Sequence, residues 1–393
     1  MIRNLLFLYW DSCFCCVDLL EALADFRDKY GGLEVVIADI EDPDSIAFDK
    51  MHSILADFSK TSAMDSVFSF GFYPSVSMYC EENNILYISW IFDNPVVNLY
   101  HKSVMNKINR LFLFDSQMTE EMKAQGVKHA YYLPMAVNPR RLSGFIPNDE
   151  IHRRYDSDVS FVGNMYTERY CYYDEMYNKL DEYTKGFLRG ILASQGKIYG
   201  DVFFERLLNN VVKKMYAAYP LNIDADFNVD QKWVYANYVL CRKLTSLERS
   251  GIIKELARYD EIDLYTEDKA FGAEGIRNHG PVDYFHEMPY VFKCSKINLN
   301  ITLRSIQKGI PLRAFDIMGC GGFLLSNYQE DMLAFFKPDE DFVFWDDIDQ
   351  IPELVKYYIR NEKERKEIAD NSYKKVIESH TFFNRLERIM ETV

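Results

Sequence analysis

The sequence predicts an α/β protein built from two doubly wound parallel sheets. Short apolar runs alternate with amphipathic helical patterns in the first third of the chain, and the same alternation returns after the Pro-containing segment 133–142. Continuous apolar strands separated by helices are typical of a parallel sheet that is covered on both faces. A chain of 393 residues is long enough for two such domains with cores of their own.

The first domain is expected over residues 1–137. The apolar pattern predicts strands at 5–10, 33–39, 66–70, 85–90, 110–114 and 131–134, with helices at 17–30, 46–60, 75–82 and 118–125. Gly126 follows the last of these helices, where glycine commonly ends a helix. The segment 133–142 then reads as the linker to the next domain.

The second domain is expected over residues 138–379. It begins with a strand at 158–162, and a helical, Tyr-rich stretch at about 167–258 is predicted to be an insertion. The α/β pattern then resumes in the following order: 262–266, 280–284, a strand at 297–301, a helix that holds Asp316, a strand at 342–344, and helices at 351–361 and 364–378. A last helix at about 380–393 can pack back on the first domain.

Composition narrows the class of function. The net charge of -15 argues against nonspecific binding of nucleic acid, which depends on Lys and Arg contacts to phosphates. No apolar run approaches the length of a membrane span, and none at the start resembles a signal peptide. The eight cysteines show no paired spacing, so we expect reduced thiols in a cytoplasmic protein without a metal site.

The segment 296–327 carries the strongest functional signal. It reads as strand, polar loop, helix and strand, and Arg304, Lys308, Gly309 and Arg313 precede or begin the helix. Free N–H groups and the positive end of a helix dipole favour phosphate at such a position, and Arg adds multidentate contacts. Asp316, one turn into the helix, could accept hydrogen bonds from a sugar. The alternative for the arginines is an ion pair with one of the many carboxylates.

Three other strand ends could contribute to a cleft, since ligands of open α/β sheets bind at the carboxyl ends of strands. Gly163-Asn164 and Tyr265-Thr266 each end a strand, although packing explains such residues equally well. Asp93 follows the strand at 85–90 and could act as a general base, or could form an Asx-turn before Pro95. No P-loop and no G-x-G-x-x-G fingerprint is present.

These segments together resemble the group 1 glycosyltransferases of GT-B fold, in particular the branch similar to the spore-maturation protein CgeB. The resemblance covers most of the chain. It rests on the following motifs: FVGN, LYT, GPVDYFHEMPYVF, NLNITLRSIQKGIPLRAFDIMGCGGFLLSNY and IADNSYKKVIESHTFFNRL in the second domain, LPMAVNP in the linker, and SFGFYPSVSMYCEENNILYISWIFDNP in the first domain.

The resemblance implies two Rossmann-like domains facing a cleft, with a nucleotide sugar such as a UDP- or GDP-sugar held by the second domain and an acceptor protein or glycan by the first. It implies no metal and no cofactor. Lys308 and Asp316 stand where the wider group has the two acids of its E-x7-E motif. The expected catalytic residues are Asp93, Arg304 and Lys308, and the expected donor-binding residues are Gly163, Asn164, Tyr265, Thr266, Val282, Tyr284, Asn300, Arg304, Gly309, Ile310, Pro311, Leu312, Arg313 and Asp316.

The prediction is therefore a metal-independent glycosyltransferase of hexosyltransferase type, with retention of the anomeric configuration favoured by the resemblance. Two alternatives stay open at this point. A noncatalytic nucleotide-sugar or glycan-binding protein of the same fold would explain Lys308 at an acidic position. An epimerase-type enzyme would use the same donors, but the seven His residues show no grouping suited to it.

Overall fold

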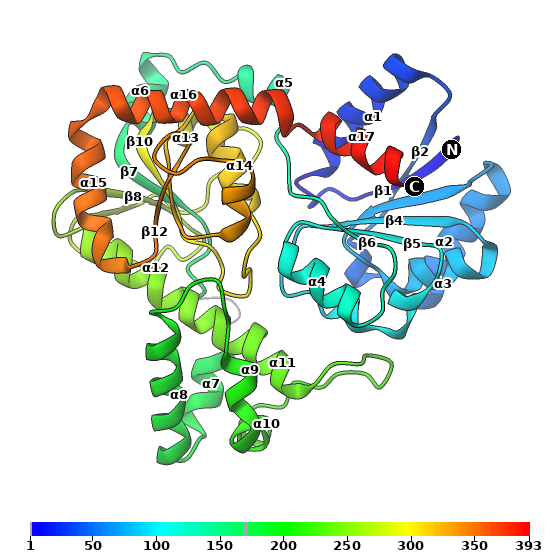
Figure 1. Ribbon diagram of the computed structural model, residues 1–393, viewed down its shortest axis with the longest axis horizontal. Coiled ribbons are helices and arrows are strands. Elements are labelled where there is room, and N and C mark those ends of the chain that lie inside the picture. Colours follow the sequence, from blue (N-terminus) through cyan, green and yellow to red (C-terminus); the bar gives the residue numbers. More distant parts are fainter. Residues whose placement is uncertain (1, 168–171) are drawn as a thin grey trace. The chain divides into compact units, whose positions relative to one another are not determined.

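The protein consists of two compact units (Figure 1), in a computed structural model that describes residues 2–167 and 172–393. Unit 1 comprises Met1–Asn138, Asp224–Asn228 and Glu378–Val393, and unit 2 comprises Pro139–Ile223 and Val229–Ile377. Each unit contains a six-stranded sheet whose paired strands are all parallel. The predicted fold class, two doubly wound α/β domains, is confirmed.

Unit 1 has the sheet order β2-β1-β3-β4-β5-β6. Its strands are β1 (Asn4–Tyr9), β2 (Glu34–Asp39), β3 (Ser66–Phe70), β4 (Leu86–Ile91), β5 (Asn109–Leu113) and β6 (Ala130–Tyr132). Its helices are α1 (Cys16–Tyr30), α2 (Phe48–Thr61), α3 (Pro74–Asn83), α4 (Ser116–Ala124) and α17 (Phe382–Thr392). The central strand β3 is buried along its whole length, as a parallel strand covered on both faces should be.

The last helix of the chain, α17, belongs to unit 1 and packs on α1. Glu387 of α17 accepts hydrogen bonds from Lys29 Nζ at 2.9 Å and from Tyr30 Oη at 2.6 Å. The neighbouring Leu386 is fully buried. Thr381 begins the helix with a capping box, which satisfies two backbone donors at once.

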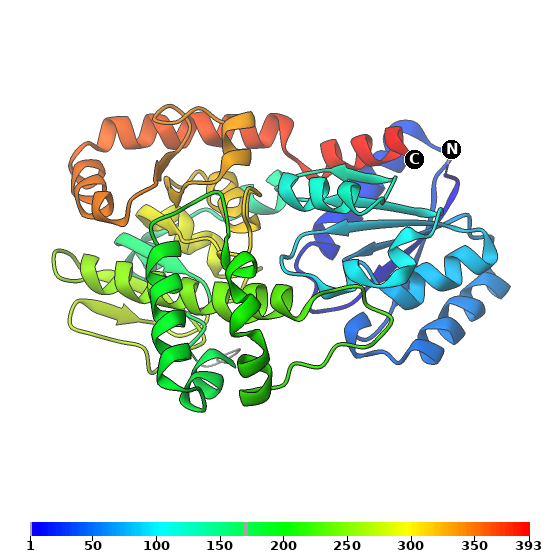
Figure 2. The same cartoon turned by 60° about the horizontal axis from the view of Figure 1, so that its bottom comes forward.

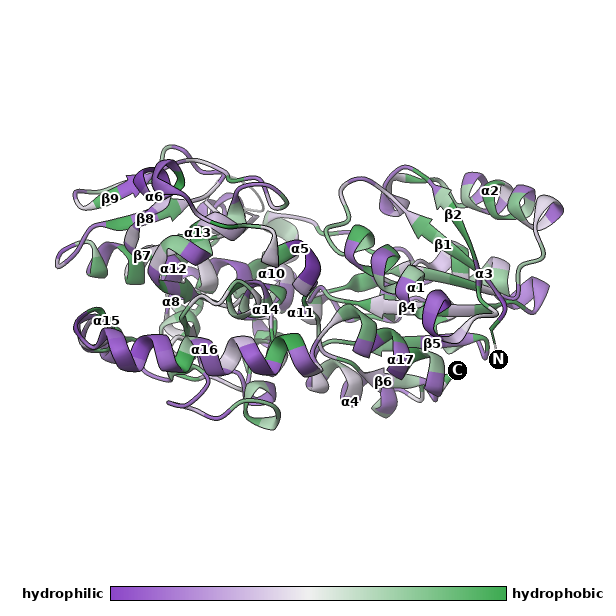
Figure 3. Ribbon diagram, turned by 90° about the horizontal axis from the view of Figure 1, so that it is seen from above, coloured by the Kyte–Doolittle hydropathy of each residue, from purple (hydrophilic) through white to green (hydrophobic). Residues whose placement is uncertain are grey.

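Unit 2 has the sheet order β12-β11-β10-β7-β8-β9. Its strands are β7 (Ser157–Val162), β8 (Ile262–Tyr265), β9 (Ile276–Asn278), β10 (Ser295–Asn300), β11 (Leu324–Asn327) and β12 (Val343–Trp345). The helices that precede the insertion or follow it are α5 (Pro139–Ser143), α6 (Asp149–Tyr155), α13 (Met288–Cys294), α14 (Leu312–Gly319), α15 (Ile351–Arg360) and α16 (Glu362–Ser379). In Figure 3, α16 is mainly hydrophilic.

One detail of this sheet differs from the sequence prediction. The α/β pattern was expected to continue through residues 280–284, but the short edge strand β9 lies before them, and residues 280–284 form a loop and the start of a turn. Residues of β9 are only partly buried or exposed. An edge strand of three residues leaves too short an apolar pattern to be predicted from sequence.

A helical lobe interrupts the α/β pattern between β7 and β8, as Figures 1 and 2 both show. It contains α7 (Tyr172–Asn178), α8 (Glu182–Gln195), α9 (Phe204–Leu207), α10 (Val212–Ala218), α11 (Gln231–Val234) and α12 (Arg242–Leu256). The lobe has its own apolar core, to which α12 contributes Leu244. Further along, α12 also contributes Ile252, Ile253 and Leu256 to the core around the sheet. One helix therefore joins two cores.

A short segment of this insertion, Asp224–Asn228, belongs to unit 1. His101 and Phe227 form an antiparallel bridge, and their rings meet edge to face with centroids 5.0 Å apart. Lys102 Nζ lies 2.7 Å from Asp226 Oδ1. The chain therefore crosses between the units at this segment as well as after Asn138 and before Glu378.

Two remaining features are the hydropathy of the helices and the state of the cysteines. Among the residues that the structure describes, no helix combines the length and apolarity that a membrane span requires. Seven cysteines are free thiols and all are buried: Cys13, Cys15, Cys16, Cys80, Cys241, Cys294 and Cys320. Cys171 lies outside the described residues.

Candidate functional site

The sheet of unit 2 has its topological switch point between β7 and β10. From β7 the chain first continues on one side with β8 and β9, and it then returns to place β10 on the other side. Ligands of open α/β sheets bind outside the carboxyl ends of the strands at such a point. In this unit those ends are Gly163-Asn164 after β7 and Ile301-Thr302 after β10. Gly163 and Asn164, two of the expected donor residues, therefore lie at the switch point.

The helix α14 begins at the same edge, after the loop that follows β10. Gly309 and Ile310 are buried, Pro311 is the N-cap residue, and Leu312 is the first helical residue. Pro311 supplies no side-chain cap to the helix. The first turn thus keeps the N–H groups and the positive dipole end that favour an anion.

Asp316 lies one turn into α14 and is nearly buried. Its Oδ1 accepts a hydrogen bond from Tyr284 Oη at 3.0 Å, and its Oδ2 lies 3.2 Å from Arg313 Nη1. The sequence prediction assigned these three residues separately, and the structure brings them together. Two donors fix the carboxylate while the side chain of Arg313 stays 27% exposed, so Arg313 can also reach an anion.

Arg249 of α12 occupies the switch point itself. Its Nε and Nη2 donate to Ile301 O at 3.0 and 2.5 Å, and its Nη1 donates to Asn164 O. The guanidinium thus ties the loop after β7 to the loop after β10. Burial is the main cause that lowers the pKa of Arg249; the nearby charge of Arg313 also lowers it, whereas Tyr166 and Glu248 act in the opposite direction. Two buried or half-buried cations near each other favour a negative ligand.

Arg304 has a different role from the one predicted. Its guanidinium donates to both oxygens of Glu248, with the shortest contact at 2.5 Å, and to the carbonyls of Gly196 and Ile198 at 3.2 and 2.9 Å. The guanidinium carbon lies 3.7 Å from the ring centroid of Tyr199. Both charged side chains are about 95% buried, with 6% and 5% exposure. Arg304 is therefore not available as a phosphate ligand, because its guanidinium nitrogens already donate hydrogen bonds to residues of the insertion.

The space around Arg304 supports the same correction. The cavity that it lines, at the carboxyl ends of β10 and β11, has a volume of about 10 Å³. That is room for about one water molecule and not for a nucleotide. Asn300, another predicted donor residue, is buried, and its Nδ2 donates hydrogen bonds to Thr302 Oγ1 and Ser326 Oγ at 3.1 and 2.8 Å. Its side-chain amide is therefore used within the protein.

Lys308 lies before Gly309 with its side chain 21% exposed, and its Nζ is 3.4 Å from Glu330 Oε2. Its backbone carbonyl accepts a hydrogen bond from Asp331 N at 3.0 Å. These contacts anchor the loop to the turn after β11. The cation stays at the protein surface near α14, but a carboxylate already neutralises part of its charge.

Gly163 and Asn164 shape the loop after β7. A Cβ at Gly163 would lie only 3.0 Å from the Phe161 ring, which favours glycine, whereas Arg249 Nη1 would lie at an ordinary contact distance of 3.7 Å. Asn164 Oδ1 accepts a hydrogen bond from Tyr166 N at 2.5 Å, as in an Asx-turn. Both residues therefore position the backbone at the switch point.

The other predicted donor residues lie along β8 and before α13. Tyr265 is buried and stacks on the His279 ring, with centroids 4.7 Å apart, and burial raises its pKa. Thr266 is 2% exposed, and its Oγ1 has no hydrogen-bond partner among the described residues. Val282 is half-buried in the loop before Tyr284. Tyr265 thus has a packing role, whereas Thr266 keeps a polar group available at the end of β8.

In unit 1 the predicted acceptor-side residue Asp93 is exposed, two residues after β4. A larger hollow of 780 Å³ opens at the carboxyl ends of β1 and β2. Its lining residues are Trp10, Asp11, Ser12, Asp39, Ile40, Glu41, Asp42, Ile46, Lys50, Ile54, Asp57 and Phe58. Asp93 is not one of them. Nothing in the sequence pattern indicated this hollow, because its walls combine the loop after β1, the loop after β2 and one face of α2.

Sequence analysis also missed Arg249 and its neighbour Glu248. Both lie in the insertion, whose sequence pattern indicated only helices that pack on one another. A signal was present: two adjacent charges interrupt an apolar helix face formed by Leu244, Ile252 and Ile253. Buried charges need partners, so such a pair predicts ion pairs or backbone contacts across the domain.

Comparison with sequence families gives a match to the second part of the chain. A family described as "Glycosyl transferase-like" matches residues 248–391, which begin at Glu248 and include all of α14. The matched part is less than half of the chain. No curated protein matches the sequence significantly.

Comparison with solved structures gives matches along the whole chain. The structure of HepE from Anabaena with UDP-glucose has a TM-score of 0.58 at 7% identity, with 99% of this chain and 98% of that chain covered. Sucrose-phosphate synthase from Thermosynechococcus elongatus has a TM-score of 0.57 at 10% identity, with coverages of 99% and 98%. WaaG, a glycosyltransferase involved in lipopolysaccharide biosynthesis, has a TM-score of 0.54 at 9% identity and 99% coverage of each chain. At such identities the likeness establishes the fold, which is GT-B.

Proposed function

We propose that this protein is a glycosyltransferase that moves a sugar from a nucleoside-diphosphate donor to a hydroxyl acceptor. The observation that carries the proposal is the group at the switch point of unit 2: the first turn of α14, Arg313 beside Arg249, and Asp316 held by Tyr284. This group offers positive charge for a diphosphate and a fixed carboxylate for a ribose. The family match over residues 248–391 and the GT-B fold support it.

In the proposed mechanism the donor binds with its diphosphate at the N–H groups of Leu312 and Arg313 and at the Arg313 side chain. As the bond between the sugar and the diphosphate breaks, negative charge develops on the leaving phosphate. Preorganised N–H groups, a helix dipole and a cation stabilise that charge more than they stabilise the intact donor. The resemblance implies that no metal ion is needed, so we expect transfer to continue in the presence of EDTA.

Asp316 is proposed to accept hydrogen bonds from the ribose hydroxyls. Tyr284 and Arg313 hold its carboxylate, which reduces the entropy lost when a ligand binds. The base is expected near Val282 and Tyr284. Thr266 Oγ1, buried at the end of β8, is a further group that can hydrogen-bond to the donor.

The acceptor is proposed to bind to unit 1, in the hollow at the ends of β1 and β2. Its carboxylates can accept hydrogen bonds from hydroxyl groups, and Trp10 adds an aromatic surface. A glycan, or a protein side chain with a hydroxyl group, could donate hydrogen bonds to these carboxylates. Asp93 does not line this hollow, so its role as the general base is a separate proposal, which requires the acceptor hydroxyl to reach the end of β4. Retention of configuration, the relationship to CgeB-like proteins of bacteria and a cytoplasmic location also remain proposals.

The function is tested with purified protein and a panel of nucleoside diphosphates and their sugars. UDP or GDP is expected to raise the melting temperature, because a ligand that binds only the native state stabilises it. A nucleotide sugar that also stabilises the protein should be hydrolysed slowly or transferred to an acceptor. No stabilisation by any nucleoside diphosphate would overturn the proposal.

A noncatalytic donor-binding protein is the second candidate, because Lys308 stands at an acidic position of the motif and pairs with Glu330. The two candidates differ in one measurement. An enzyme releases nucleoside diphosphate from the stabilising nucleotide sugar, whereas a binding protein leaves it intact. Release that disappears in the Arg313→Ala variant would assign the activity to this site.

A further inference from the structure

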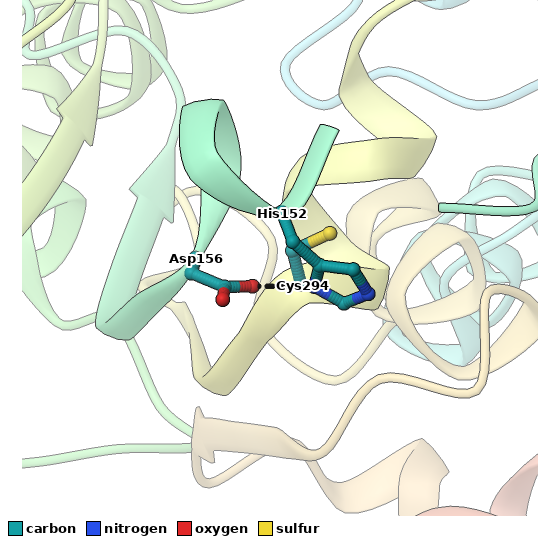
Figure 4. A group of neighbouring side chains, drawn as sticks. All are labelled: His152, Asp156 and Cys294. Carbon is teal, nitrogen blue, oxygen red and sulfur yellow. Dashed lines mark hydrogen bonds and ion pairs between the residues drawn. The ribbon is translucent and has the colours of Figure 1, made fainter. Parts of the chain in front are cut away.

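Three side chains of different chemistry meet at the ends of two helices of unit 2 (Figure 4). His152 lies on α6, Asp156 directly follows that helix, and Cys294 is the last residue of α13. His152 Nδ1 is 2.7 Å from Asp156 Oδ1. The candidate ligand atoms of all three residues, including Cys294 Sγ, lie within 4.8 Å of one another.

The imidazole–carboxylate contact alone has an ordinary explanation, since residues four apart at the end of a helix lie on one face. It does not explain the thiol, which reaches the group from another helix. A nitrogen, an oxygen and a sulfur ligand form the mixed set that zinc-type ions accept. Harder ions such as Mg²⁺ prefer oxygen ligands throughout.

The three ligand atoms are already almost close enough to bind one ion, so the side chains need to move only slightly. A tetrahedral zinc ion holds its ligand atoms about 3.5 Å apart, given bonds of about 2.0 to 2.3 Å. The side chains of His152 and Asp156 are 49% and 62% exposed, so they can rotate, while Cys294 is 8% exposed and fixed. The buried thiol therefore defines the position, and the two exposed side chains close on it.

The charges also match a divalent ion. With a thiolate, a carboxylate and a neutral imidazole, the ligands carry two negative charges, and the occupied site is neutral. A coordinating thiol loses its proton when the ion binds.

We propose that His152, Asp156 and Cys294 form a binding site for a zinc-type divalent ion, which links α6 to α13 and leaves one coordination position to water. The site is separate from the proposed donor site and does not depend on the proposed function. Other contacts already join the two helices: Glu287 Oε1 accepts from Arg154 Nη2 at 2.7 Å and from Tyr155 Oη at 3.1 Å. The ion adds a further link at the opposite end of α13, so its expected effect is to stabilise unit 2.

The site is tested by titrating metal-free, reduced full-length protein with Co²⁺ and then with Zn²⁺. Cobalt bound to a thiolate gives a charge-transfer band in the near ultraviolet, and Zn²⁺ should abolish that band by displacement. One equivalent is expected per chain. Saturating Zn²⁺ should raise the melting temperature by roughly 5 °C, as binding to the native state requires.

Two variants locate the site. Cys294→Ser should lose the cobalt band, and His152→Ala should weaken Co²⁺ binding at least tenfold. Cys16→Ser is the matched control, because Cys13, Cys15 and Cys16 in unit 1 are the other cluster of thiols. A band that survives in Cys294→Ser, or is lost in Cys16→Ser, would overturn the assignment, as would the absence of any band. If Cys294→Ser fails to fold, the exposed His152→Ala variant decides the question.

Discussion

Two arginines in the same segment show why a residue type does not determine a role. Arg304 and Arg313 looked alike in the sequence, as cations on either side of Gly309. In the structure Arg304 is enclosed with Glu248, while Arg313 keeps part of its side chain at the surface beside Asp316. The difference comes from α12, which lies far away in the sequence and brings Glu248 to Arg304.

The Arg313→Ala change should lower affinity for the nucleoside diphosphate about 10- to 100-fold. A hydrogen bond to a charged group contributes about 1.5–3 kcal/mol, and this variant removes at least one. Isothermal titration with UDP or GDP measures the effect. Arg360→Ala, an exposed arginine of α15, is the control and should bind normally. Unchanged affinity in Arg313→Ala would refute its role as a phosphate ligand.

The Arg304→Ala change should act on stability. It leaves the buried carboxylate of Glu248 without its partner, and breaking a buried pair in this way costs about 3–5 kcal/mol. Urea unfolding followed by circular dichroism measures this loss. The control is Arg258→Ala, which breaks an exposed pair with Glu255 and should cost about 0–1 kcal/mol. Equal effects of the two changes would contradict the structural role of Arg304.

At the scale of elements, α12 is the connection between the helical lobe and the sheet of unit 2. Its first half packs in the lobe core and its second half in the sheet core. Between them lie Glu248 and Arg249, whose contacts hold the loops after β7 and β10. The insertion is therefore part of the support of the candidate site.

Two leucines of α12 provide a matched test of this connection. Leu244 is 3% exposed in the lobe core, whereas Leu247, one turn later, is 49% exposed. Leu244→Ala should cost about 2–5 kcal/mol of unfolding free energy, since it leaves a cavity. Leu247→Ala should stay within about 0.5 kcal/mol. Equal stability of the two variants, measured by urea unfolding, would show that the lobe core does not depend on α12.

At the scale of the whole molecule, each unit has its own parallel sheet and its own cavity or candidate site. The proposed donor residues all belong to unit 2, and the hollow proposed for the acceptor belongs to unit 1. The chain passes between the units at several points, including the segment Asp224–Asn228. Binding of the nucleotide should therefore change the dynamics of unit 2 first, and a measurement that separates the two units can detect this.

Hydrogen exchange provides that assignment. With saturating UDP or GDP, slower exchange is expected in the amides of residues 309–316, because ligand binding suppresses local opening of the first turn of α14. The strands β1 and β2 of unit 1 should exchange as they do without ligand. Mass spectrometry of peptic fragments measures both regions. Protection confined to unit 1 would place the nucleotide elsewhere and contradict the proposed site.

The sequence by itself determined the local features of this protein. Apolar runs of three to seven residues separated by amphipathic helices predict a parallel sheet, so the two doubly wound domains followed from the pattern. The position of α14 and the presence of Asp316 and Arg313 near its start followed in the same way. These properties depend on residues close together in the chain.

Only the tertiary structure decided which of these side chains a ligand can reach. Glu248 and Arg304 are 56 residues apart in sequence and share a hydrogen bond of 2.5 Å, and Tyr284 reaches Asp316 across 32 residues. His152 and Cys294 likewise come together from two helices. The energy of a buried charge depends on such partners, and no periodic pattern in the sequence encodes them.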